Sequence, residues 1–198
     1  MIRRDRDRRG EGTRTSIPAF LDRARETNER LELRGGRIFV TTRAGTIHDL
    51  LRARTAKILR RQLEGRPWRV LEGEAVQLDQ HNVLRPDIAI VFSAQDRPRI
   101  AADPVAVVEI IEPATADVDR GERGQHYRDV RSVEHYVLIS TDAQRVELFS
   151  REAARSWSYR SYDGLHRMVP LATLDITLLL AAVYEGIDIA AGGRRAGL

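Results

Sequence analysis

Short apolar runs alternate with polar segments along this chain, and two of the runs are typical of strands buried on both faces. The run PVAVVEIIEP (104–113) lies between two prolines and contains one carboxylate, Glu109. The run RPDIAIVF (85–92) is shorter and begins next to Pro86. Continuous apolar runs of this kind predict buried strands. Because an unpaired ionised carboxylate inside such a strand costs several kcal/mol, Glu109 needs a partner.

One segment has the periodicity of an amphipathic helix. It is TIHDLLRARTAKILRRQLEG (46–65), in which Thr46 and Asp49 resemble a capping box and Gly65 is expected to end the helix. The apolar stripe of this helix is predicted to consist of Ile47, Leu50, Leu51 and Ile58. The stripe would pack against a sheet.

A second helix is predicted from its polar composition. It is DVDRGERGQHYRDVRS (117–132), with Asp119 as its cap and Glu122 three residues later. Near the end, LDITLLLAAVYEGID (174–188) predicts a short strand and then a helix that starts at Thr177. Further strands are predicted at 30–40, as a hairpin around Gly35-Gly36, and at 68–78, 133–140, 145–150 and 157–162. The order of elements predicts an α/β fold, a mixed β-sheet flanked by two main helices.

Composition narrows the class of protein. The chain has 198 residues, of which 42% are hydrophobic and 31% charged, which is typical of one soluble globular domain. It has no cysteine, so disulfides and thiolate metal sites are excluded. The first residues are not typical of a secretory signal, and the apolar run ITLLLAAVY is too short to span a bilayer. A cytoplasmic protein that does not associate with a membrane is expected.

The positive charge is concentrated at the start of the chain. Residues 1–15 hold six arginines against three acidic residues, which accounts for most of the formal net charge of +4. We expect residues 1–15 to be a disordered basic tail, 16–189 a single domain and 190–198 a flexible tail. The basic tail would either contact nucleic acid phosphates without sequence preference or simply be a solvated end.

The two buried runs bring two carboxylates together if their strands are neighbours. Side chains alternate across a strand, so Glu109 shares a face with Val107, and Asp87 shares one with Ala89. Asp87 and Glu109 would then converge at one edge of the sheet, where a hard divalent cation such as Mg²⁺ relieves their repulsion. Two alternatives stay open: Asp87 as a turn residue after Pro86, and Glu109 in an ion pair with an arginine of the second helix.

The order of several segments resembles that of a known family. RPDIAIV, VAVVEIIEPAT, DRGERGQHY and VEHYVLIS follow one another as in the large bacterial family of "putative restriction endonucleases" (Uma-type) of the PD-(D/E)XK nuclease superfamily. LELRGGRI resembles the hairpin of that family, and TIHDLL its histidine-led helix. The resemblance covers roughly residues 20 to 185. It implies a restriction-endonuclease-like core and metal-dependent hydrolysis of DNA.

The resemblance also implies roles for individual residues. Asp87 and Glu109 would bind Mg²⁺ or Mn²⁺, and Ile110 would lend its backbone carbonyl. Glu32 would be a further acidic member of the catalytic site, although a solvent-facing strand residue is an equally good interpretation. His48 would lie near the mouth of the site, but we favour a histidine that faces water at the border of the helix. Tyr127 would lie one helical turn beyond the position of the family's lysine, either in the site or as a packing residue.

This sequence departs from the family at the lysine. The usual superfamily position, two residues after Glu109, is occupied by Ile111, and the position to which the lysine moves in this branch is Arg123. A guanidinium places a positive charge next to the scissile phosphate, but it does not replace an ammonium in orienting water. Lys57 is the only lysine in the chain and is the alternative candidate. The turn serine of the family is replaced by Glu112.

Two hypotheses follow. The first is a Mg²⁺-dependent endonuclease in which Asp87 and Glu109 hold the ion and Arg123 stabilises charge on the phosphate. The second is a nuclease-fold module with weak or no activity that binds nucleic acid or a protein partner. DNA is the expected partner, and a homodimer is common for this fold.

Overall fold

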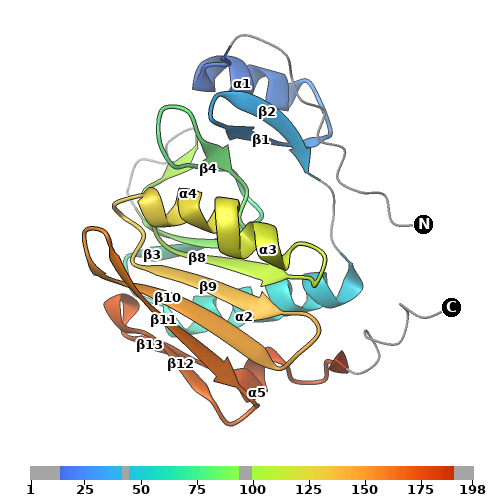
Figure 1. Cartoon of the computed structure of the whole chain (residues 1–198), viewed down its shortest axis with the longest axis vertical. Coiled ribbons are helices and arrows are strands. Elements are labelled where there is room, and N and C mark those ends of the chain that lie inside the picture. Colours follow the sequence, from blue (N-terminus) through green and yellow to red (C-terminus); the bar gives the residue numbers. More distant parts are fainter. Residues whose placement is uncertain (1–13, 42–44, 94–99, 190–198) are drawn as a thin grey trace, which may run out of the picture.

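A six-stranded mixed sheet lies at the centre of the molecule and contains both strands predicted from the apolar runs (Figure 1). This computed structural model describes residues 14–41, 45–93 and 100–189. In spatial order the strands are β11 (Ser156–Asp163), β10 (Arg145–Ala153), β9 (His135–Ser140), β8 (Pro104–Ile111), β6 (Ile88–Phe92) and β3 (Trp68–Glu72). Strands β8 and β9 are parallel, and the other neighbours are antiparallel. The mixed α/β fold is as predicted.

Strand β8 is buried along its whole length because both faces of the sheet are covered. One face packs against α2 (Thr46–Gln62) and the hairpin of β12 (Met168–Leu171) and β13 (Ile176–Leu179). The other face is covered by the polar helical segment, which consists of α3 (Ala116–Val118), the π-helical turn η1 (Asp119–Arg123) and α4 (Gly124–Asp129). The short elements η2 (Ala172–Leu174) and α5 (Leu180–Val183) flank β13. The large sheet is therefore the middle layer of three, with α4 in front of it and α2 behind it (Figure 1).

A second, five-stranded sheet lies beside one end of the large sheet, at the top of Figure 1. Its order is β2 (Arg37–Thr41), β1 (Arg30–Arg34), β5 (Val83–Leu84), β4 (Val76–Gln77) and β7 (Ala101–Ala102). Helix α1 (Ile17–Arg25) packs on it through Phe20, which forms a small core with Leu31, Leu33 and Val83. The β1–β2 hairpin was predicted from the sequence. Strand β4 lies at the end of the strand predicted at 68–78, whereas helix α1 and strands β5 and β7 were not predicted.

The ends of the chain are described only in part. The predicted tails 1–15 and 190–198 lie outside the described residues, except for residues 14 and 15. The Thr15 amide donates a hydrogen bond to the Gly36 carbonyl at 2.8 Å, in the hairpin turn. The division into two tails and one domain stays a prediction. Over the ranges that are described, no helix is long and apolar enough to cross a membrane.

Helix α2 is rotated about its axis relative to the prediction. Leu50 is 51% exposed, whereas the helix buries His48, Leu51, Thr55, Ala56 and Leu59. The predicted capping box is also wrong, because Gly45 is the N-cap residue and no side chain caps the helix. The helix ends at Gln62 with Leu63 as its C-cap residue, and Gly65, which has a positive φ of 74°, lies two residues further on.

Two other predicted helix starts are wrong. The polar helix begins at Ala116, and Asp119 is a buried residue inside the helical segment and caps nothing. Thr177 lies in β13, where it pairs with Pro170, and the final helix begins only at Leu180. In both cases a residue type that favours helix starts is used for another purpose, since tertiary packing overrides local preference.

A buried histidine makes the fold sensitive to acid. The Thr173 amide donates to His135 Nε2 at 3.2 Å, so the ring proton is on Nδ1, which lies 3.1 Å from Ser150 Oγ. Burial lowers the pKa of His135 to about 4. Below an ordinary histidine pKa the unfolded chain binds a proton that the folded chain does not, so stability falls between about pH 6.5 and pH 4. The loss is expected to reach about 2–3 kcal/mol at pH 4.

This expectation is tested by urea unfolding between pH 4 and pH 7. The His135→Gln variant should lose the acid-sensitive part of its stability and show a flatter pH profile. The control is His166→Gln, because His166 is exposed. An identical pH profile for wild type and His135→Gln would contradict the assignment.

Candidate active site

A cavity of about 550 Å³ lies between the small sheet, the start of α2 and the segment that follows β8. It is the place where the predicted site residues meet. Its lining includes the acidic residues Glu32, Asp87, Glu109, Glu112 and Asp119 together with Arg123. We call Glu32, Asp87, Glu109 and Asp119 the acidic centre. All four are buried.

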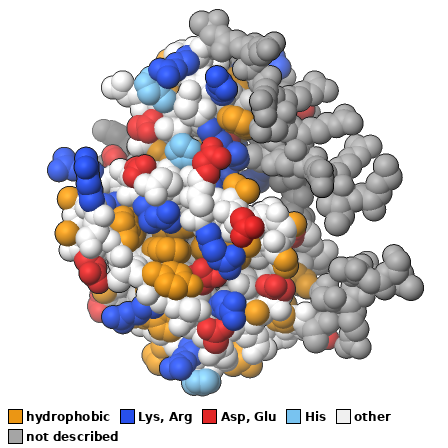
Figure 2. All heavy atoms as spheres, viewed as in Figure 1, with side chains coloured by type: hydrophobic (Ala, Val, Ile, Leu, Met, Phe, Trp, Pro, Cys, Tyr) orange, Lys and Arg blue, Asp and Glu red, His pale blue; other side chains and the backbone are white. Residues whose placement is uncertain are grey.

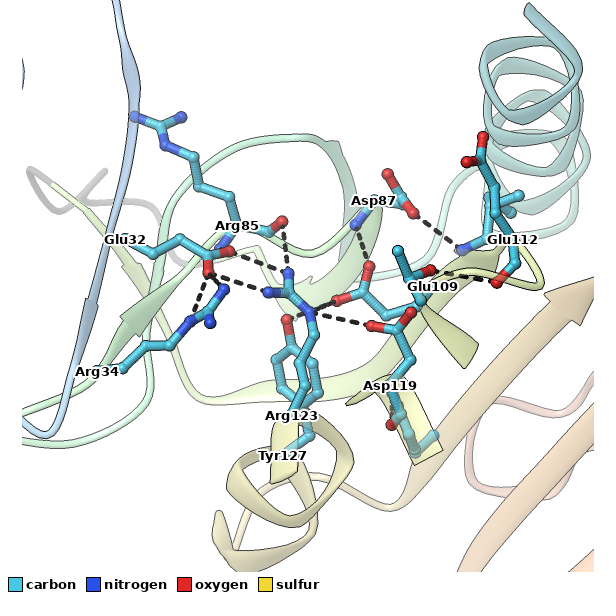
Figure 3. Close-up of polar contacts among 12 residues, drawn as sticks. Glu32, Arg34, Arg85, Asp87, Glu109, Glu112, Asp119, Arg123 and Tyr127 are labelled. Carbon is cyan, nitrogen blue, oxygen red and sulfur yellow. Dashed lines mark hydrogen bonds and ion pairs between the residues drawn. The ribbon is translucent and has the colours of Figure 1, made fainter. Parts of the chain in front are cut away.

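Asp87 and Glu109 face each other from neighbouring strands, as strand alternation predicts. Strand β6 pairs with β8 so that Ile88 lies opposite Val108, and Asp87 lies next to Glu109. The Asp87 amide donates to Glu109 Oε2 at 3.1 Å, and the Ile110 amide donates to Asp87 Oδ2 at 2.8 Å. Each carboxylate is therefore held by the backbone of the other strand (Figure 3). Asp87 is thus bonded to strand β8 and is not simply a turn residue after Pro86.

The partner of Glu109 is Arg123, from the end of η1. Arg123 Nε donates to Glu109 Oε1 at 2.7 Å and lies 3.6 Å from Asp119 Oδ1. Its two Nη groups donate to Glu32 at 2.9 and 3.0 Å, and Nη2 also donates to the Arg85 carbonyl at 3.1 Å. Figure 3 shows the guanidinium between the Glu32 and Glu109 carboxylates. Glu109 therefore lies beside Asp87, as in the predicted metal site, and also forms an ion pair with an arginine of the helical segment, which was the alternative prediction.

Glu32 is fully buried in β1 and is not a solvent-facing strand residue. Besides the two bonds from Arg123 it accepts two from the Arg34 side chain, at 2.9 and 2.6 Å, and one from the Arg85 amide at 2.8 Å. With this many donors its oxygens are occupied. Glu32 therefore connects the small sheet to η1 through Arg123, and its oxygens are not free to bind a metal ion. Its predicted catalytic role stays a prediction.

Tyr127 and Asp119 complete the surroundings of Glu109. Tyr127 is fully buried, and its hydroxyl donates to Glu109 Oε1 at 2.8 Å, so it lies in the site and also packs in the core. Asp119 was not predicted as a site residue, because its spacing from Glu122 is that of a capping box. It lies one helical turn before Arg123, which was the signal that could have placed it in the site.

His48 is buried, and the prediction that it faces water is wrong. Its Nε2 lies 2.9 Å from Asp87 Oδ2, so the ring orients the carboxylate from the side of α2. The helical period contains the signal that was overlooked. His48 shares a stripe with Leu51, Thr55 and Leu59, at spacings of three and four residues, and these are the residues that α2 buries.

The pKa values of Glu32 and Glu109 are shifted in opposite directions, although both residues are buried. Burial acts to raise the pKa of Glu32, but Arg123 and Arg34 outweigh it and lower this pKa to about 2. Burial, opposed by Arg123 but reinforced by the charges of Asp87 and Asp119, raises the pKa of Glu109 to about 8. Glu32 is therefore ionised at neutral pH, whereas Glu109 retains a proton for much of the time.

The other two carboxyl groups differ in the same way. Burial acts against ionisation of Asp87, but the hydrogen bond and charge of His48 and the Ile110 amide lower its pKa. Burial raises the pKa of Asp119, which Arg123 offsets only in part. Burial therefore disfavours the ionised forms of Glu109 and Asp119, and a further cation bound beside them would favour their ionisation.

The remaining predicted residues divide into two groups. Ile110 and Glu112 line the cavity, and Glu112 Oε1 accepts a hydrogen bond from the Gly45 amide at 3.2 Å, at the start of α2. Lys57 is exposed on α2 and is not part of the cavity lining, so Lys57 does not replace the family's lysine in this arrangement. On the face shown in Figure 2, basic and acidic side chains are interspersed, and the surface has no large area of one sign.

Comparisons with known proteins show the family of the chain. The sequence model of the family Uma2, "Putative restriction endonuclease", matches residues 17–182. The chain belongs to this family. Two uncharacterized proteins of Synechocystis sp. are each 21% identical to it, over 170 and 164 residues. The alignments cover 84% and 79% of this chain and 87% and 92% of the two relatives.

The fold of this Uma2 member is also found in a solved structure. The crystal structure of a "putative nuclease belonging to DUF820" from Anabaena variabilis superposes with a TM-score of 0.67 at 14% sequence identity. The superposition covers 85% of this chain and 97% of the other. The resemblance noted in the sequence is thereby confirmed. Uma2 membership and the nuclease-like fold together support the nuclease class.

Proposed function

We propose that this Uma2 protein is a Mg²⁺-dependent endonuclease that hydrolyses DNA phosphodiester bonds. The observation that carries the proposal is the interlocked pair of Asp87 and Glu109 in the wall of the cavity. Two buried carboxylates on neighbouring strands need a cation, and the name of the family points to DNA as the substrate. A cytoplasmic location and a homodimer stay predictions from the sequence.

The donor atoms present fit a hard divalent ion. Within the described ranges, no three acidic or histidine side chains are arranged as a metal site. Mg²⁺, however, typically uses one or two carboxylates and completes its coordination with water and substrate oxygens. Asp87, Glu109 and the Ile110 carbonyl would hold it. When bound, Mg²⁺ or Mn²⁺ would neutralise phosphate charge and make a water molecule more acidic.

The protein's own residues would position the two carboxylates and stabilise the charge that develops on the phosphate. His48 and the Ile110 amide hold the Asp87 carboxylate, and Tyr127 holds that of Glu109. Arg123 already donates to Glu109, and its delocalised charge is suited to the oxygens of a phosphate in which negative charge develops. Because a guanidinium does not lose its proton in a protein, Arg123 stabilises charge and does not act as the base.

One observation favours the second candidate, a nuclease-fold module that binds nucleic acid with little or no turnover. The Arg123 guanidinium is engaged by two carboxylates and a backbone carbonyl, so it already neutralises part of the acidic centre. A resident cation of this kind competes with a metal ion. The two candidates differ in turnover and not in fold, so an activity measurement separates them.

The proposal is tested by incubating full-length protein with supercoiled plasmid DNA. We expect nicked and linear products with Mg²⁺ or Mn²⁺, and none when EDTA is added. Binding of labelled DNA is measured on the same samples. Binding without any product in the presence of either ion would replace the endonuclease by the binding module.

A further inference from the structure

Two arginine side chains lie side by side on the wall of the cavity. Arg30 begins β1, Arg85 precedes β6, and both line the cavity. Both reach the same glycine: Arg85 Nη1 donates to the Gly73 carbonyl at 3.3 Å, and a Cβ atom at Gly73 would lie 3.2 Å from Arg30 Nη1. We call Arg30 and Arg85 the arginine pair. Figure 3 shows the Arg85 side chain extending away from Arg123 and Glu109, so the pair is separate from the acidic centre.

The arginine pair is neutralised only in part, by Glu32 and Glu74, whose charges act on Arg85 without forming an ion pair with its side chain. The Arg85 side chain donates to two uncharged backbone acceptors, the carbonyls of Leu31 and Gly73. Among the described residues, no carboxylate forms an ion pair with either Arg30 or Arg85. Two guanidinium groups held together in this way favour the binding of an anion.

The backbone around the arginine pair is built to hold it in place. Gly73 has a positive φ of 58°, and the Arg30 guanidinium lies where a side chain at that position would be. The Gly73 amide donates to the Asp87 carbonyl at 2.9 Å, which fixes this turn to the strand that carries the acidic centre. The turn at Gly73, which both arginines reach, is therefore held next to Asp87 by a backbone hydrogen bond.

We propose that the arginine pair binds a DNA phosphate adjacent to the one that is cleaved. The inference rests on the proposed function and specifies its substrate: a polynucleotide with at least one further phosphate beside the scissile bond. Guanidinium groups match the geometry of phosphate oxygens, and phosphate contacts fix the register of a nucleic acid. The pair would also compensate for the repulsion between the acidic centre and the DNA backbone.

The test is the binding of a fluorescently labelled DNA duplex by the full-length protein in EDTA, measured by anisotropy. Arg30→Gln is expected to raise Kd about tenfold and to reduce the salt dependence by about one phosphate contact. Arg30→Lys keeps the charge but loses the guanidinium fork, so its Kd should lie between those of wild type and Arg30→Gln. The matched control is Arg37→Gln, on the same hairpin, because Arg37 is exposed and does not line the cavity.

Failure of this inference is distinguishable from failure of the proposed function. If wild type binds and nicks DNA while Arg30→Gln and Arg37→Gln have the same Kd, the arginine pair is not a phosphate site. If wild type neither binds nor nicks, the endonuclease proposal fails and this inference fails with it. Thermal melts of each variant are recorded first, and Arg30→Lys replaces Arg30→Gln in the comparison with Arg37→Gln if the glutamine variant is unfolded.

Discussion

Glu109→Gln should reduce plasmid nicking by more than about 100-fold while leaving the protein folded. The amide keeps the size of the side chain, and its carbonyl oxygen can accept the hydrogen bond from Tyr127, whereas its NH2 group takes the place of Oε2 and gives up the bond from the Asp87 amide. It cannot supply the negative charge that a divalent ion needs. Because the pKa of Glu109 is raised to about 8, the neutral amide resembles the protonated form that is present in the metal-free protein at neutral pH.

The pH dependence of stability provides a second measurement on the same variant. A carboxyl group with a raised pKa in the folded state makes the protein less stable as pH rises from about 4.5 to about 8. Glu109→Gln removes this loss, so its melting temperature at pH 8 should equal or exceed that of wild type. The control is Glu64→Gln, at an exposed position outside the cavity. Full nicking activity in Glu109→Gln would eliminate the proposed metal site.

Arg123→Ala should destabilise the metal-free protein by about 3–5 kcal/mol, because it leaves buried carboxylates without their cation. The side chain is 12% exposed and is bonded to Glu32 and Glu109 at once. Addition of Mg²⁺ should recover part of the loss, since the ion supplies positive charge at the same place. Urea unfolding with and without Mg²⁺ measures both effects.

The control for this variant is Arg54→Ala. Arg54 pairs with Glu185 on the surface, where 33% and 78% of the two side chains are exposed, so its loss should cost less than about 1 kcal/mol. Arg123→Lys should keep the fold and raise cleavage, because it restores the lysine that the sequence resemblance implies at this position. Wild-type stability of Arg123→Ala would show that Glu109 is neutralised by another group. Unchanged or lower cleavage by Arg123→Lys would show that the guanidinium at this position does not limit turnover.

The part of the site that depends on strand alternation could be predicted from the sequence. The buried runs around Asp87 and Glu109 are continuous, and consecutive strands are usually neighbours. Arg123 was predicted as a site residue because it occupies the position at which the resemblance implies a lysine. The burial of His48 was missed because the apolar stripe of α2 was assigned from its largest aliphatic side chains, including Leu50, instead of from the period that places His48 beside Leu51.

Contacts between segments far apart in the chain could not be predicted in the same way. Glu32 reaches Arg123 over 91 positions of the sequence, and only the packing of the small sheet brings the two together. That sheet is built from strands as short as Val83–Leu84, which are too short for a periodic pattern. Asp119 was misassigned for a different reason, because a capping box and a buried ion pair have the same residue types at the same spacing.

The bond between Glu32 and Arg123 has an evolutionary consequence. The Arg123 guanidinium bonds to Glu32 of the small sheet and to Glu109 of the acidic centre. Selection for the proposed activity and selection for stability therefore act on the same position. A lysine there carries one charged group in place of the guanidinium fork, so restoring it would give up bonds to Glu32. This trade-off between stability and activity predicts that lineages with lysine at this position strengthen the junction between the small sheet and η1 at other positions.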